Sequence, residues 1–370
     1  MINIKLERVN DQLCANLHGR SYSIVEESRG VREKFWMKRT GKHLYYESPI
    51  HSRILFKFNR NDVSCEDWGE IYFSKLCNNM GIPCVTYTLA QAYDENDNFL
   101  GNGVMCGSYK RSVSESEFSV YDLQMGNDGT HLNCNADKIN TVDGIIEGVR
   151  NNFDNLLEND IVTLRNELII QAIMDFLCCQ SDRHWLNTTI LVYGSPQKTY
   201  IRKAPCYDNG CIAMLKRKQS AIEGMSKEIG KKGKDSEFLA AQLSKFCPMF
   251  GIKTSLVELK PEKNGFNRNE RVKIKSPKAS REIFLDEIAD EILTNPPIAI
   301  FFSDLRRLIE KQGIDGLGFQ KIHNGLEAEG NPPPECIEKM IRDVFGHQFD
   351  VLLERVNSRL KMYKVQENVR

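Results

Sequence analysis

A charged loop follows directly on the most apolar part of the chain. The run LIIQAIMDFLCC, residues 168–179, has the spacing of a buried helix, and SDRHWLN follows it at residues 181–187. Beyond the loop, NTTILVYG and KTYIRKAPCY alternate as strands do, and GSPQK is typical of the turn that joins them. An acid, two bases and an amide are too costly for a core strand, so a helix, a polar loop and a hairpin are expected here in that order.

The rest of the chain divides into a strand-rich beginning and a helical remainder. SYSIVEE, REKFWMK and RILFKF have the pattern of strands, whereas CEDWGEIYFSKLCNNMG predicts a helix that ends at Gly81. After the polar link SVSESEFSVYDLQMGNDGTHLNCNADKIN, helical spacing recurs in VDGIIEGVRNNF, IVTLRNELIIQAIMDFLCC and three runs near the end. We therefore expect an α+β fold, with a β-rich lobe at residues 1–110 and a mostly helical lobe at 111–370.

Length and composition exclude several classes of protein. A chain of 370 residues suits two lobes or two domains. Its 50 basic and 50 acidic residues cancel, so no direct nucleic-acid binding is expected. None of its 12 cysteines has CxxC spacing, which argues against a zinc site or a disulfide framework. The polar N-terminus and the lack of an apolar stretch of about 18 residues favour a cytoplasmic protein without a transmembrane segment.

Three polar residues have the order that phosphoryl transfer uses. Asn187 follows Asp182 by five positions, and Asp208 lies 21 positions further, just beyond the hairpin. In such an arrangement the first acid orients the attacking hydroxyl and accepts its proton, and the amide and the second acid hold magnesium. The alternative is structural: a polar turn with a local salt bridge at Asp182, and a turn at Asp208 formed with Asn209 and Gly210.

The loop resembles a known catalytic motif. D-R-H-x-x-N, Asp182 to Asn187, is similar to the catalytic loop of phosphatidylinositol-kinase-like enzymes, and Asp208-Asn209-Gly210 stands where they have their metal-binding D-F-G. The N-terminal half resembles the HipA kinases, bacterial serine/threonine kinases that are related in fold to the lipid kinases. The similarity spans residues 21 to 212 in the expected order.

Three N-terminal segments carry the resemblance to the HipA kinases. Their phosphate loop reads S-x-x-G-x-x-x-K, and Ser28 to Lys34 is close to it, with one residue fewer before the glycine. Their strand lysine follows I-L, as Lys57 follows Ile54-Leu55-Phe56 here. Their next helix reads E-x-x-x-x-x-L-x-x-x-x-G-I-P, which matches Glu70 through Pro83.

The resemblance implies a two-lobed protein-kinase-like or PI-kinase-like fold with ATP and Mg²⁺ as cofactors. Asp182 would act as the base, Asn187 and Asp208 would bind the metal, and His184 would either brace the loop or help with transition-state charge. Lys57 would contact the phosphates.

The resemblance also places the nucleotide. Lys57 would pair with Glu70, with Glu66 as the competing acid, or else be a surface lysine. Ser28 and Gly30 would belong to the phosphate loop. The backbone of Met105 to Gly107 would read the adenine edge.

The implied function is transfer of the γ-phosphate of ATP to a serine or threonine hydroxyl of a protein, with autophosphorylation. Two alternatives stay open. One is a phosphoinositide kinase, which acts on an inositol lipid. The other is a non-catalytic nucleotide-binding module of the toxin–antitoxin or regulatory type, with an antitoxin partner. Delivery into another cell as an effector also stays open.

A basic stretch follows Asp208. Residues 216–234 lie where a kinase has its activation or substrate-binding loop. They would either recognise an acidic partner or form a solvated, mobile loop. Residues 215–370 form a C-terminal helical extension, either family-typical packing or a substrate module.

Overall fold

The computed structural model describes the chain except for residues 10–11, 18, 28–32, 40–52, 60–63, 112–113, 125–139, 185–186, 196, 260–271, 275 and 370. The chain divides into two compact units, each assembled from separate stretches. The first unit contains Met1–Glu115, Ala204–Lys227 and Leu317–Met340, and the second contains Ser116–Lys203, Glu228–Gly316 and Ile341–Arg370. The predicted lobes, residues 1–110 and 111–370, stay a prediction.

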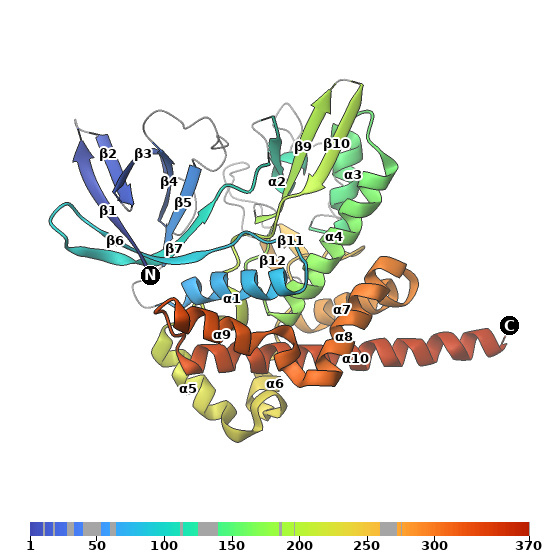
Figure 1. Cartoon of the computed structure of the whole chain (residues 1–370). Coiled ribbons are helices and arrows are strands. Elements are labelled where there is room, and N and C mark those ends of the chain that lie inside the picture. Colours follow the sequence, from blue (N-terminus) through green and yellow to red (C-terminus); the bar gives the residue numbers. More distant parts are fainter. Residues whose placement is uncertain are drawn as a thin grey trace. The chain divides into compact units, whose positions relative to one another are not determined.

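Seven strands of the first unit form a closed barrel in the order β1-β2-β3-β4-β5-β7-β6 (Figure 1). They are β1 (Ile2–Val9), β2 (Gln12–Leu17), β3 (Arg20–Glu27), β4 (Lys34–Arg39), β5 (Arg53–Phe58), β6 (Thr88–Tyr93) and β7 (Phe99–Gly107). The pair β1–β6, with Ile2 opposite Ala90, is parallel and closes the barrel, whereas the other pairs are antiparallel. The strand-rich beginning is therefore confirmed.

The barrel has an aromatic and aliphatic core. Alternate residues of its strands are buried together, because successive side chains of a strand point to opposite faces. The buried set is Ile4, Ala15, Leu17, Tyr22, Phe35, Met37, Phe56, Ala90 and Ala92. Phe56 and Phe58 both pack on this side, with ring centroids 4.7 Å apart. Lys57 lies between them in sequence and therefore points away from the barrel core.

Helices complete the first unit. The predicted helix α1 (Glu66–Asn79) is present, and Gly81, with a φ of +70°, follows its end. The helix α9 (Phe319–Ala328) was not predicted from the sequence, and it is followed by α10 (Glu335–Val369). A hydrogen bond from Tyr72 Oη to Glu338 Oε2, at 2.9 Å, connects α1 to the start of α10.

The basic stretch is helical, so the alternative of a loop is wrong, and recognition of an acidic partner stays a prediction. After the short helix η3 (Ile212–Met214), the chain forms α5 (Gln219–Ile229) and then η4 (Gly230–Asp235). Ile222 and Met225 are buried, so α5 has an apolar face that holds it against the protein. The positive charges dominated the sequence pattern and concealed this face.

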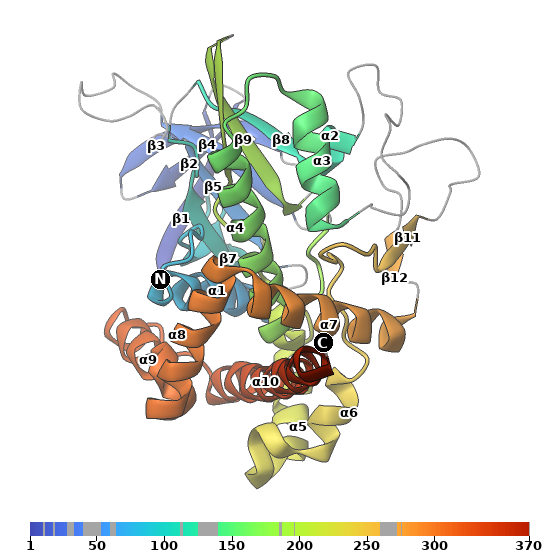
Figure 2. The same ribbon diagram turned by 90° about the vertical axis from the view of Figure 1, so that its right-hand side faces the viewer.

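The second unit contains the predicted helix and hairpin. Its sheet has the order β10-β9-β8, with β8 (Ser116–Ser119), β9 (Thr189–Ser195) and β10 (Lys198–Lys203). Figure 2 shows α4 (Glu158–Leu177) running along this hairpin, as its packing on β10 requires. Both faces of the C-terminal half of α4 are buried, which accounts for the nearly continuous apolar run. These elements place the charged loop at the end of a buried helix.

The remaining elements of the second unit are mostly helical. They are α2 (Val120–Gln124), α3 (Val142–Asn152), α6 (Glu237–Leu243), β11 (Val257–Leu259), β12 (Val272–Ile274), α7 (Pro277–Thr294), α8 (Pro296–Gln312), η5 (Gly313–Leu317) and most of α10. The helical remainder expected from the sequence is thus confirmed. Within the described part of the chain, no helix has the length and apolar character needed to cross a membrane.

Candidate active site

Lys57 is a buried lysine on the outer face of the barrel. It pairs with Lys34 of β4 on one side and with Val104 of β7 on the other. Next to Val104, a Cβ on Gly103 would lie 2.0 Å from the Lys57 carbonyl oxygen, so only glycine permits this approach of β7 to β5. The lysine is 2% exposed, which rules out the alternative of a surface lysine.

Two carboxylates neutralise the Lys57 ammonium. Its Nζ lies 2.6 Å from Glu70 Oε1 and 2.7 Å from Asp208 Oδ1. Glu70 is completely buried, whereas the Asp208 side chain keeps 22% of its surface exposed. A buried charge persists only when it is paired and hydrogen-bonded, so the two carboxylates are required to keep the Lys57 ammonium inside the first unit. Glu70, predicted as the partner of Lys57, takes that role, while Glu66 accepts hydrogen bonds from Ser64 and Cys211.

Backbone contacts hold the Asp208 segment in place. The Asn209 N–H donates to Glu70 Oε2 at 2.6 Å, and the Asp208 N–H donates to Tyr87 Oη at 3.2 Å. Two residues earlier, the backbone of Cys206 pairs with that of Cys84 in an isolated parallel β-bridge. Asp208 itself has a φ of +56°, a left-handed conformation that aspartate adopts more readily than most residues. These contacts define the position of its carboxylate to an extent that a simple surface turn would not.

Tyr87 is part of this group although the sequence offered no signal for it. Its ring centroid lies 5.7 Å from Lys57 Nζ, within the range of a cation–π contact. Burial raises the pKa of the Tyr87 hydroxyl well above 10, with the negative charge of Glu70 acting in the same direction. The hydroxyl therefore stays protonated while it accepts from the Asp208 backbone. Burial likewise raises the pKa of the nearby Cys106 thiol to about 12.

A second group of predicted residues lies in the second unit. The Asn187 side-chain amide donates to the Asp182 carbonyl oxygen at 2.8 Å, and the Asn187 N–H donates to the His184 carbonyl oxygen at 2.8 Å. Asn187 Nδ2 also lies 3.4 Å from His184 Nε2. The loop therefore closes on itself, and Asp182, His184 and Asn187 are brought together. Asp182 is half-buried.

A buried ion pair braces this loop. Arg183 Nε lies 2.9 Å from Asp175 Oδ2, and Arg183 Nη1 donates to the Asn187 carbonyl oxygen at 3.0 Å. Both charged side chains are almost wholly buried. Burial raises the pKa of the Asp175 carboxyl, and the Arg183 guanidinium opposes this. Asp175 was not among the predicted residues, although a lone acid within an apolar helical run is a signal that could have identified it.

The other predicted residues have different outcomes. Ser28 and Gly30, of the expected phosphate loop, lie outside the described residues. Met105 lies between β5 and β6, opposite Phe56 and Thr88, so its backbone groups belong to the barrel ladder. Gly107 ends β7 opposite Ile54 and is exposed.

The described residues include no cluster of three or more histidine, cysteine, aspartate or glutamate side chains arranged to hold a metal. The predicted magnesium ligands are fewer, one amide and one carboxylate, so this observation does not bear on them. Mg²⁺ keeps several waters and is bound by one or two carboxylates together with substrate phosphates. The partly exposed carboxylate of Asp208 has the chemistry that such a site needs.

The fold is similar to that of a kinase of known structure. The proinflammatory kinase CtkA of Helicobacter pylori superposes with a TM-score of 0.56 at 13% sequence identity, over 90% of this chain and 95% of that chain. HipA, in the complex of HipA, HipB and operator DNA from Shewanella oneidensis, superposes with a TM-score of 0.44 at 12% identity, over 90% of this chain and 65% of that chain. No protein-family model and no curated protein matches the sequence. The chain therefore shares its fold with the kinase CtkA.

Proposed function

We propose that this protein is an ATP- and magnesium-dependent kinase that transfers the γ-phosphate to a serine or threonine hydroxyl of a protein, itself included. The observation that carries the proposal is the buried Lys57 ammonium held between Glu70 and Asp208. Lys57 and Asp208 are 151 positions apart, and they make this contact in a fold that is shared with a kinase. A merely structural ion pair has no need of a second, partly exposed carboxylate.

In this proposal the first unit binds the nucleotide. Lys57 contacts the phosphates, and Glu70 keeps its ammonium charged and oriented. Asp208 and Asn187 are the residues that would each contribute a ligand to Mg²⁺, and the metal would neutralise phosphate charge. Gly107 is better placed than Met105 to offer backbone groups to adenine, because it ends its strand. Ser28 and Gly30 would approach the phosphates through their backbone N–H groups.

The second unit provides the groups for the acceptor. Asp182 would orient the acceptor hydroxyl and accept its proton, since the residue is half-buried rather than fully buried. Asn187 is held by its own hydrogen bonds and by the Arg183 brace, which gives its amide a defined direction. The contact between His184 and the Asn187 amide favours a bracing role for the histidine.

A radiolabel-transfer assay tests the proposal. The purified full chain is incubated with γ-labelled ATP and Mg²⁺, with a generic protein substrate and phosphatidylinositol vesicles offered in parallel. Label on the chain itself or on the protein, on serine or threonine in phosphoamino-acid analysis, supports the proposal. Label on lipid alone overturns the protein acceptor in favour of a lipid kinase. Nucleotide binding without any transfer overturns the enzyme in favour of a non-catalytic module.

A further inference from the structure

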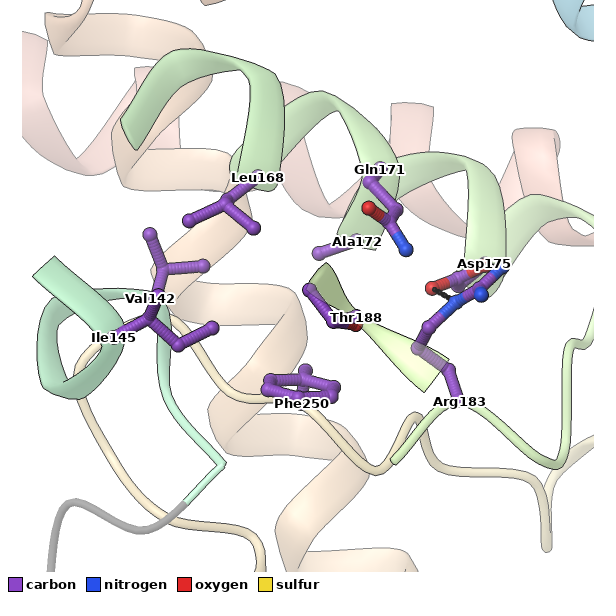
Figure 3. A pocket seen from close by; sticks show the side chains of 9 residues that line it. All are labelled: Val142, Ile145, Leu168, Gln171, Ala172, Asp175, Arg183, Thr188 and Phe250. Carbon is purple, nitrogen blue, oxygen red and sulfur yellow. Dashed lines mark hydrogen bonds and ion pairs between the residues drawn. The ribbon is translucent and has the colours of Figure 1, made fainter. Parts of the chain in front are cut away.

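A small internal cavity lies next to the ion pair that braces the catalytic loop. Figure 3 shows its polar side, formed by Gln171, Asp175, Arg183 and Thr188, and its apolar side, which includes Leu168 and Phe250. All of these residues belong to the second unit, so the cavity is internal to that unit. Its volume is about 10 Å³.

Thr188 presents a polar atom to this cavity. Its side chain is 4% exposed, and among the described residues its Oγ1 has no hydrogen-bond partner. A buried hydroxyl left in that condition is costly, and most such groups in folded proteins are bonded to protein or to ordered water. Gln171 is buried to the same extent, and Figure 3 shows its amide directed toward the same space.

The cavity matches one ligand in size and chemistry. A volume of about 10 Å³ accommodates about one water molecule, which needs two to four polar partners. We propose that Thr188 and Gln171 hold one buried water molecule here, at the border of the Asp175–Arg183 pair, and that this water positions the catalytic loop. A cavity with purely apolar walls would stay dry, but this one has a hydroxyl, an amide and a carboxylate on one side.

The route from the water to the loop is short. Thr188 follows Asn187 directly in sequence, and Arg183 donates to the Asn187 carbonyl oxygen from the other side. A water bonded to Thr188 therefore restrains the same peptide unit that the ion pair restrains. Thr188 and Gln171 are thus positioning residues, and this part of the inference rests on the proposed function. The water site itself does not.

The sign of the change in Tm in a single variant distinguishes a hydrated cavity from a dry one. Thr188→Val removes the hydroxyl and keeps the shape. If the water is bound, the variant loses a hydrogen bond and its Tm falls by about 1–2 °C. If the cavity is dry, the variant removes an unpaired buried hydroxyl and its Tm rises. Thr199→Val, at a half-buried site on β10, controls for the exchange itself and should leave the Tm nearly unchanged.

Direct observation and kinetics complete the test. A high-resolution crystal structure of the full chain should show a water within hydrogen-bonding distance of Thr188 Oγ1 and the Gln171 amide, and an empty cavity overturns the water site. In the transfer assay, Thr188→Val should lower kcat on the order of 3–10-fold with an unchanged KM for ATP, and Thr188→Ser should recover much of the loss. If the water is seen and kcat does not change, the positioning role is wrong. Absence of transfer in the wild-type chain refutes the proposed function and leaves the water site to the first two measurements.

Discussion

Lys57 Nζ lies 2.6 Å from Glu70 Oε1, with both side chains almost wholly removed from water. The two residues are 13 positions apart, one on a barrel strand and the other on the helix that follows. Since neither charge would be stable there alone, each depends on the other. This dependence makes the pair the best point at which to perturb the proposed nucleotide site.

Lys57→Met should destabilise the protein and abolish transfer. Without the ammonium, the buried Glu70 carboxylate loses its counterion, which costs about 3–5 kcal/mol of unfolding free energy. Chemical denaturation and nucleotide binding measure the two effects. Lys75→Met is the matched control, because its ammonium is 4.0 Å from the exposed Glu329 and such pairs contribute about 1 kcal/mol or less. Equal losses in the two variants would contradict the role given to Lys57.

Asp182→Ala should separate chemistry from binding. Loss of the proton acceptor should lower the transfer rate on the order of 10²–10⁴-fold, while ATP affinity, measured calorimetrically, stays close to that of the wild type. Asp154→Ala, at an exposed acid of the same unit, should leave both quantities unchanged. Unchanged turnover in Asp182→Ala would remove this residue from the mechanism.

The buried ion pair between Arg183 and Asp175 should contribute far more to stability than a surface ion pair. Arg183→Met leaves Asp175 buried without a counterion and should cost about 3–5 kcal/mol. Arg150→Met breaks a pair of similar length, to Glu158, in which both side chains are about half exposed, and should cost about 1 kcal/mol or less. Thermal and urea unfolding of the two variants compare them, and the ranking is wrong if Arg150→Met is the more damaging.

Two glycine substitutions should have opposite signs. In Gly103→Ala the new Cβ would lie 2.0 Å from the Lys57 carbonyl oxygen, so the β5–β7 ladder must shift, at a cost of about 1–3 kcal/mol or more. In Gly224→Ala the new Cβ meets nothing within 4 Å on the exposed side of α5, and the helix should gain about 0.5–1 kcal/mol. Denaturation midpoints give both values. A stabilised Gly103→Ala would mean that the strands are less closely apposed.

Stability should fall in alkaline solution, in part through buried thiols. Burial raises the pKa of Cys65, Cys106, Cys179 and Cys247 from 9.0 to about 12. Between these pH values the unfolded chain has lost thiol protons that the folded chain keeps. The contribution of these thiols to the free energy of unfolding is therefore complete below pH 9 and is lost as the pH rises toward 12.

The variant Cys106→Ala isolates one of these thiols. Above pH 9, the unfolding free energy of this variant should fall less steeply with pH than that of the wild type. The two slopes should differ by up to about 1.4 kcal/mol per pH unit, which is the effect of one proton. Parallel curves for the two proteins would show that Cys106 ionises normally. Thiol labelling before and after denaturation gives an independent measure of protection.

Much of the local structure was predictable from the sequence. The strands around REKFWMK and RILFKF, the helix that ends before Gly81, the apolar helix and the hairpin all follow from periodicity and turn residues. The hydrogen bonds from Asn187 to the carbonyl oxygens of Asp182 and His184 were equally open to prediction, because these partners lie within five residues of each other. Local patterns were misleading in the basic stretch, where the lysines hid the apolar face of α5.

The sequence by itself determined the types and order of the elements and the residues worth examining: Lys57, Glu70, Asp182, Asn187 and Asp208. The tertiary structure alone decided that Lys57 meets Asp208, 151 positions away, that Tyr87 lies beside them, and that a parallel pair of strands closes the barrel. The reason is physical. Periodicity and turn chemistry act over a few residues, whereas the partner of a buried charge depends on which distant segments the hydrophobic core brings together.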